Sequence, residues 1–71
     1  MLYYTAHARK RMSMRSISEH EVEYCIENHT IEYSDKKGNT IYTAYTLANR
    51  YIKVIIDKNY RKSIKVITVG D

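Results

Sequence analysis

The chain has 71 residues, is 44% hydrophobic and 28% charged, and carries a net charge of +4, which favours a polyanionic partner such as RNA. A globular chain of this length is one domain whose core is about one layer of helices on one sheet, which excludes a disordered tail and a second domain. The single cysteine, Cys25, excludes an internal disulfide framework, and the absence of a secretion signal or a long apolar run predicts a cytoplasmic protein without a membrane partner.

The first predicted elements are a short strand or extended segment over residues 2–5 and a helix over residues 6–15. Steps of four residues place His7, Arg11 and Arg15 on one stripe of this helix, spread over about 80° around its axis. Apolar neighbours flank the stripe, so we expect it to lie on the inward half of the helix. Lys10 and other polar residues form the opposite, solvated face.

A second helix is predicted to begin at Ser18, because Glu21 three residues later completes a capping box. Its apolar positions, which include Val22 and Cys25, recur at three- and four-residue spacing, and its glutamates are mostly turned outward. The helix is predicted to end near Asn28. Because Cys25 lies on the apolar face among glutamates, we interpret it as a buried structural thiol.

From residue 30 onward the period of the hydrophobic pattern changes from 3.6 to 2, which is typical of strands. It predicts an antiparallel sheet of four strands, at residues 30–34, 40–48, 51–57 and 63–69, with a polar loop at 58–62 before the last strand. The predicted fold class is α+β, with both helices packed on one face of this sheet. Ile55, Ile67 and Val69 break the alternation, so the second face is not fully polar and leaves room for another molecule.

The stripe of His7, Arg11 and Arg15 suits an RNA phosphodiester. Guanidinium groups bind phosphate oxygens, and a histidine that titrates near neutral pH can move the proton of a 2′-hydroxyl. Cleavage of this kind needs neither a metal ion nor a cofactor, and the arginines would stabilise the charge of the transition state. Further candidates for binding phosphates or stacking bases are Arg9, Tyr42, Tyr45, Tyr51, Lys53 and Lys65.

Spacing alone leaves an alternative open for the stripe. Arg11 and Arg15 would instead pair with Glu19 or Glu23 across the turn between the helices, and His7 would fill space. Metal and nucleotide sites are not expected. Cys25 and His29 offer only two possible ligands, and the chain has no glycine-rich phosphate loop.

The run H-A-R-K-R-M-S-M-R-S-I-S at residues 7–18 resembles the opening H-A-x-x-R-M-x-x-R-G-I-S of a family of short bacterial proteins classed as a domain of unknown function. That family closes with a basic, β-branched strand similar to residues 65–69. It is similar in fold to RelE and ParE toxins and to the barnase, EndoU and colicin group of ribonucleases. The resemblance implies one RelE/ParE-like domain over residues 1–71, with His7, Arg11, Arg15 and Thr68 as candidate catalytic residues.

These observations lead us to expect a toxin-like, metal-independent endoribonuclease, with RNA as its substrate and a small antitoxin as a further partner. Two alternatives are a non-catalytic module that binds RNA or a protein and a ParE-like toxin that inhibits a protein target. The sequence departs from the family pattern at Ser16, where the family has glycine. The junction between the helices is therefore either strained or differently shaped.

Overall fold

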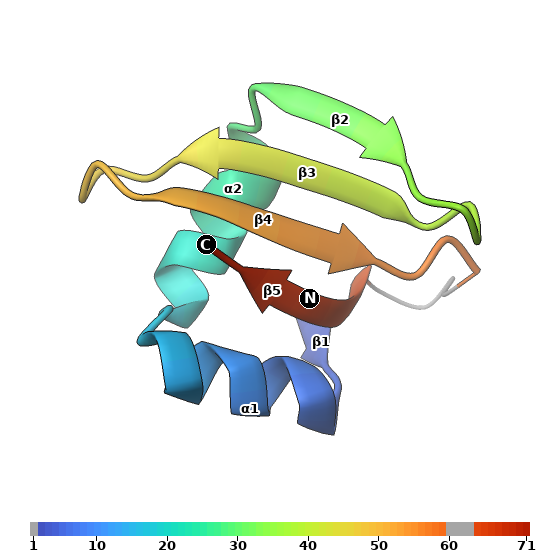
Figure 1. Cartoon of the computed structure of the whole chain (residues 1–71), viewed down its shortest axis with the longest axis horizontal. Coiled ribbons are helices and arrows are strands. Elements are labelled where there is room, and N and C mark those ends of the chain that lie inside the picture. Colours follow the sequence, from blue (N-terminus) through green and yellow to red (C-terminus); the bar gives the residue numbers. More distant parts are fainter. Residues whose placement is uncertain (1, 60–63) are drawn as a thin grey trace.

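The computed structural model describes residues 2–59 and 64–71 and shows two helices against a twisted sheet (Figure 1). The elements in chain order are β1 (Leu2–Tyr4), α1 (Ala6–Arg15), α2 (Glu19–Glu27), β2 (Ile31–Ser34), β3 (Thr40–Tyr45), β4 (Tyr51–Ile56) and β5 (Ile64–Gly70). The α+β class and both predicted helices are confirmed. The predicted start of the last strand at Ser63, and residues 60–62 of the predicted loop, lie outside the described residues.

The sheet has five strands in the order β1-β5-β4-β3-β2, and β1 runs parallel to β5. The predicted short strand at residues 2–5 is present as Leu2–Tyr4, but it pairs with β5 as a fifth, parallel strand, so the prediction of a four-stranded antiparallel sheet is wrong. A strand of three residues is too short for its pattern to show whether and how it joins the sheet. The predicted strand at residues 40–48 is also three residues too long at its end, since β3 ends at Tyr45. The chain leaves β3 after Tyr45 and turns back with the amide of Thr46 bonded to the carbonyl of Arg50 at 2.8 Å.

The ends of the two helices follow from local chemistry. The Thr5 hydroxyl accepts a hydrogen bond from the amide of Ala8 at the start of α1. In the predicted capping box of α2, the Glu21 amide donates to the Ser18 hydroxyl and the Ser18 amide donates to the Glu21 carboxylate. Ser16 ends α1 with a φ of 55°, in the left-handed region. The strained form of the junction is therefore the one that this sequence adopts.

One hydrophobic core lies between the helices and one face of the sheet. Helix α2 contacts β3 and β4, whereas α1 contacts β5 and β1 along the side of the sheet (Figure 1). The buried residues of this core are Ala8, Met12, Ile17, Val22, Cys25, Ala44, Ile52, Val54, Ile56, Val66 and Val69. Each large apolar side chain stabilises the fold by about 1.5–3 kcal/mol when fully buried. No described helix covers the other face of the sheet, called the open face below.

A β-bulge in β5 explains the irregular pattern of the last strand. Val66 lies opposite Ile56 and Thr68 opposite Ile55, so Ile67 is an extra residue on β5. The bulge changes the alternation of side chains between the two faces. As a result Val69 returns to the core, and Thr68 joins Ile55 on the open face.

Candidate nucleic-acid interface

Helix α1 runs beside the part of β5 that β1 leaves unpaired. Strand β1 pairs with β5 only as far as Val66. Beyond that point the Thr5 hydroxyl donates to the carbonyl of Ile67 at 2.8 Å, and Nε of Arg11 donates to the carbonyl of Val69 at 3.2 Å. Buried or partly buried carbonyls need such partners. Two side chains from the start and middle of α1 thus complete the hydrogen bonding of this edge.

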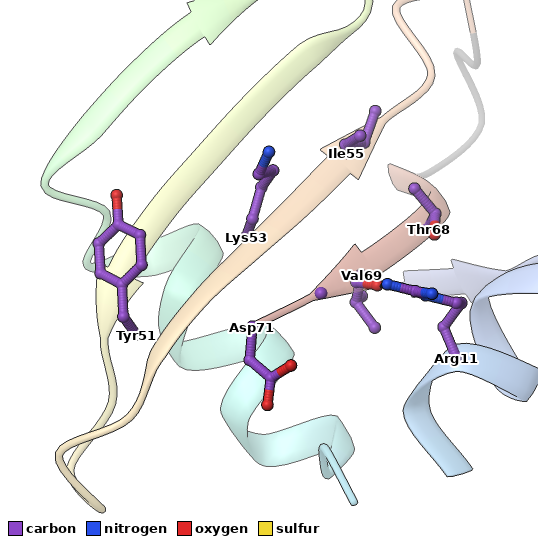
Figure 2. A pocket seen from close by; sticks show the side chains of 8 residues that line it. Arg11, Tyr51, Lys53, Ile55, Thr68, Val69 and Asp71 are labelled. Atoms are coloured by element: carbon purple, nitrogen blue, oxygen red, sulfur yellow. The ribbon is translucent and has the colours of Figure 1, made fainter. Parts of the chain in front are cut away.

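Next to Arg11 a groove of about 280 Å³ opens on the open face of the sheet. Its lining includes Arg11 from α1, Tyr51, Lys53 and Ile55 from β4, and Thr68 from β5. Figure 2 shows Tyr51, Lys53 and Ile55 projecting from the same side of β4, while Arg11 extends from α1 toward β5. The three β4 residues share this side because they alternate with residues of the core.

The groove carries an excess of positive charge. Of the charged side chains in its lining, those of Arg11 and Lys53 are cationic and that of Asp71 is anionic. Nε of Arg15 is 3.8 Å from Oδ1 of Asp71 and balances that charge. This pair is partly exposed, so it contributes at most about 1 kcal/mol to stability. With Arg15 and Asp71 balancing each other, the two cations on the walls are available to an anionic ligand.

The packing of α1 holds the Arg11 guanidinium at the groove. Nε is bonded to the carbonyl of Val69. Nη2 of Arg11 lies close to the backbone of Gly70. If Gly70 had a Cβ atom, that atom would be 3.4 Å from Nη2. Nε is therefore occupied by the protein, and the two terminal nitrogens of the guanidinium make no hydrogen bond to any described residue.

The structure brings together four predicted site residues that came from three separate arguments. Arg11 comes from the helical stripe, Thr68 from the resemblance, and Tyr51 and Lys53 from the predicted sheet. Tyr45 adjoins them, because its ring centroid is 5.0 Å from that of Tyr51.

His7 and Arg15 do not line the groove, so the predicted convergence of the stripe is incomplete. Both side chains are exposed, and the buried residues of α1 are Ala8 and Met12. The prediction of an inward stripe is wrong for His7 and Arg15, because α1 packs along the edge of β5 and buries only a narrow face, whereas Arg11 is half-buried against β5. His7 lies one turn before Arg11, and its side chain makes no hydrogen bond or ion pair with any residue that the structure describes.

The ion pair between the two helices is formed by Arg9 and Glu19, and the Arg9 guanidinium also lies 4.5 Å from the ring centroid of Tyr4. The alternative in which Arg11 or Arg15 pairs with a glutamate of α2 is therefore wrong. Both arginines turn toward the end of β5 instead. Arg9 itself, a predicted RNA-binding residue, is used between the helices and lies outside the groove.

Two further candidates also lie outside the groove. Tyr42 is on the face of the sheet that the helices cover, and its ring centroid is 4.3 Å from that of His29. Nζ of Lys65 is 4.0 Å from a carboxylate oxygen of Asp57, at the beginning of β5. Tyr42 belongs to the alternate set of β3 positions from Tyr45, so the two tyrosines point to opposite faces.

Comparison of the sequence with known protein families gives a match. The family model for a domain of unknown function, DUF4258, matches residues 4–71. The chain belongs to the DUF4258 family. No curated protein and no solved structure matches the chain, so the likeness to RelE and ParE toxins stays a prediction. In the described part of the DUF4258 domain, no helix is long and apolar enough to cross a membrane.

Cys25 of the DUF4258 domain has a structural role, as the sequence predicted. The side chain is fully buried, and its Sγ lies 3.6 Å from the carbonyl of Tyr42. Burial raises the pKa of the thiol to about 11, so the thiolate that a nucleophile requires does not form near neutral pH. Within residues 2–59 and 64–71, no three His, Cys, Asp or Glu side chains are grouped closely enough to hold a metal ion.

Sequence reasoning did not assign four of the groove residues of the DUF4258 domain to a site, namely Ile55, Val69, Gly70 and Asp71. Asp71 meets Arg15 only through tertiary packing, and no spacing in the sequence joins them. Ile55 did give a signal, because it breaks the alternation of β4, but the sequence could not show what lies beside it.

Proposed function

We propose that the DUF4258 domain binds the backbone of RNA in the groove and cleaves it without a metal ion. The main support is that Arg11 and Lys53 line one groove together with the aromatic ring of Tyr51. Guanidinium and ammonium groups are the side chains that bind phosphate oxygens most effectively. A groove with this charge should bind a polyanion with an affinity that falls as salt concentration rises.

In the proposed reaction the 2′-oxygen of a ribose attacks the adjacent phosphorus. The bond from phosphorus to the 5′-oxygen breaks, which leaves a 2′,3′-cyclic phosphate and a 5′-hydroxyl. His7 accepts the proton of the 2′-hydroxyl, and water gives a proton to the leaving oxygen. Arg11 stabilises the charge that develops on the phosphoryl oxygens, and Thr68 supplies a hydroxyl donor to the same group.

The exposed position of His7 is compatible with this role. It lies one helical turn from Arg11, where side chains four residues apart are neighbours. With no described hydrogen bond to hold it, the ring is free to rotate toward a strand bound in the groove. Catalytic hydrogen bonds often form only once the substrate is present.

Incubation of a labelled single-stranded RNA with the purified protein in excess chelator tests the proposal. We expect fragments that end in a 2′,3′-cyclic phosphate, and a rate at least about 100-fold lower for His7→Ala. His20→Ala is the matched control, because His20 is another exposed histidine and lies on α2. Equal rates for wild type and His7→Ala would exclude His7 as the proton acceptor.

Binding of RNA without cleavage is the second candidate, and the position of His7 outside the groove lining favours it. In that case the wild-type protein would leave RNA intact at every pH. Binding would still weaken with salt, and Lys53→Ala would bind less tightly than wild type. If RNA neither binds nor is cleaved, both candidate functions are wrong, and a protein partner captured from cells would point to a ParE-like inhibitor.

A further inference from the structure

We infer that Tyr45 and Tyr51 form a stacking platform for an unpaired base beside the groove, so that the RNA bound there is single-stranded. This inference rests on the proposed function, because the groove supplies the phosphate contacts that hold the strand near the platform. The two tyrosines lie directly opposite each other on β3 and β4. Tyr51 also lines the groove, so the platform and the groove are continuous.

The two rings are fixed by each other but remain open to solvent. Their centroids are 5.0 Å apart, a separation at which aromatic pairs attract each other, and their planes are tilted by 58°. The exposed fractions are 62% for Tyr45 and 42% for Tyr51. The mutual contact therefore orients the rings and still leaves ring surface on which a flat ligand can stack.

The hairpin end that carries the platform is held in place before any ligand binds. The amide of Arg50 donates to the hydroxyl of Thr46, which closes the turn between β3 and β4. The Arg50 guanidinium donates to the carbonyl of Ser16 at 2.9 Å and also pairs with Glu21. The turn is thus tied to the junction of the two helices. A surface that is ordered in advance loses little conformational entropy when it binds.

The spacing along β4 connects the platform to the phosphate contacts. Lys53 follows Tyr51 on the same face of the strand, about 7 Å further on. A base stacked on the tyrosine pair would therefore have its own backbone beside the Lys53 ammonium, with Arg11 across the groove. The positive charge of the groove and the aromatic surface next to it together match a nucleic-acid strand.

Stacking on an aromatic side chain requires a free base face. In a duplex the base faces are covered by their neighbours, whereas an unpaired base can stack on tyrosine whatever its identity. A platform of this kind therefore predicts preference for single strands with little dependence on base sequence.

The test measures dissociation constants with the full chain and a fluorescein-labelled 2′-O-methyl oligouridine, which 2′-oxygen attack cannot cleave. Two comparison ligands are the same oligonucleotide annealed to its complement and a backbone of the same length without bases. We expect Tyr45→Ala to weaken binding of the single strand by about 5-fold to 100-fold, and Tyr45→Phe to bind within about twofold of wild type. Leu47→Ala is the control, because it removes a large side chain, 87% exposed, from the same hairpin without removing a ring.

The dependence of affinity on salt separates the platform from the groove. Tyr45→Ala should keep the wild-type salt slope, since it removes no charge, whereas Lys53→Ala should lower the slope by about one. The platform would be overturned if the duplex or the base-free backbone bound as tightly as the single strand, or if Tyr45→Ala left the affinity unchanged. The proposed phosphate contacts in the groove would still be supported in that case if Lys53→Ala lowered the salt slope. Absence of binding by all three ligands at low salt would overturn both.

Discussion

The Nε group of Arg11 donates a hydrogen bond to the backbone carbonyl of Val69, 58 residues away in the sequence, at 3.2 Å. The bond supplies a partner for a carbonyl at the edge of β5 that β1 does not reach. It also holds the guanidinium beside the groove that Arg11 lines. Arg11 is therefore a residue of the fold as well as of the candidate site, and its replacement should affect both.

Replacement of Arg11 by alanine should lower the free energy of unfolding by about 1–2 kcal/mol, because the Val69 carbonyl loses its partner. Arg15→Ala removes the same charge from the same helix but breaks only the partly exposed pair with Asp71, so we expect a loss below about 0.5 kcal/mol. Denaturant unfolding of both variants measures the difference. Equal losses for the two variants would show that the bond to Val69 adds nothing to stability.

Thr5 should be more important for stability than its place at a helix end suggests. Its hydroxyl accepts from the amide of Ala8 and donates to the carbonyl of Ile67. Thr5→Val keeps the shape of the side chain and removes both bonds, which should cost about 2 kcal/mol. Thr5→Ser keeps the hydroxyl and should stay within about 0.5 kcal/mol of wild type. Hydrogen exchange at the amide of Ala8 should also become faster in Thr5→Val, and an unchanged rate would contradict the cap.

The elements that the sequence predicted well are those whose causes are local. Ser18 and Glu21 are three residues apart, so the capping box of α2 can be recognised without knowledge of the fold. The alternation of β4 is likewise local, and it explains why Tyr51 and Lys53 share the open face. Both predictions depend only on the period of the pattern and on hydrogen bonds between near neighbours.

The groove could not be predicted as a unit, because it depends on contacts between distant segments. Arg11 reaches it only because β1 ends at Tyr4 and leaves the edge of β5 to α1. The bulge at Ile67 then decides that Thr68 faces the groove. The sequence shows the stripe on α1, but not the side of the sheet against which α1 packs, so it overestimated how far His7 and Arg11 share one site.

Ser16→Gly should stabilise the protein. Ser16 has a φ of 55°, a left-handed conformation that costs an L-residue about 1–2 kcal/mol and glycine little. Glycine loses more entropy on folding, so the expected net gain is about 0.5–1 kcal/mol, which corresponds to a rise in Tm of several degrees. Ser16→Ala keeps a Cβ and is the control, for which we expect no gain. Thermal unfolding of the three proteins measures the effect, and a lower Tm for Ser16→Gly would mean that the serine side chain stabilises the junction.

The buried thiol of Cys25 should make stability fall in alkaline solution. Burial raises its pKa from 9.0 to about 11, so the native state binds the proton more tightly than the unfolded state. Above pH 9 the unfolded chain loses this proton first, and stability should fall by up to about 1.4 kcal/mol per pH unit until pH 11.

Cys25→Ala should be less stable overall, through lost packing, but should show a shallower fall over that range. Tyr4, whose pKa burial raises to about 12, acts equally in both proteins and cancels in the comparison. Parallel stability curves from denaturant unfolding would contradict a proton held by Cys25.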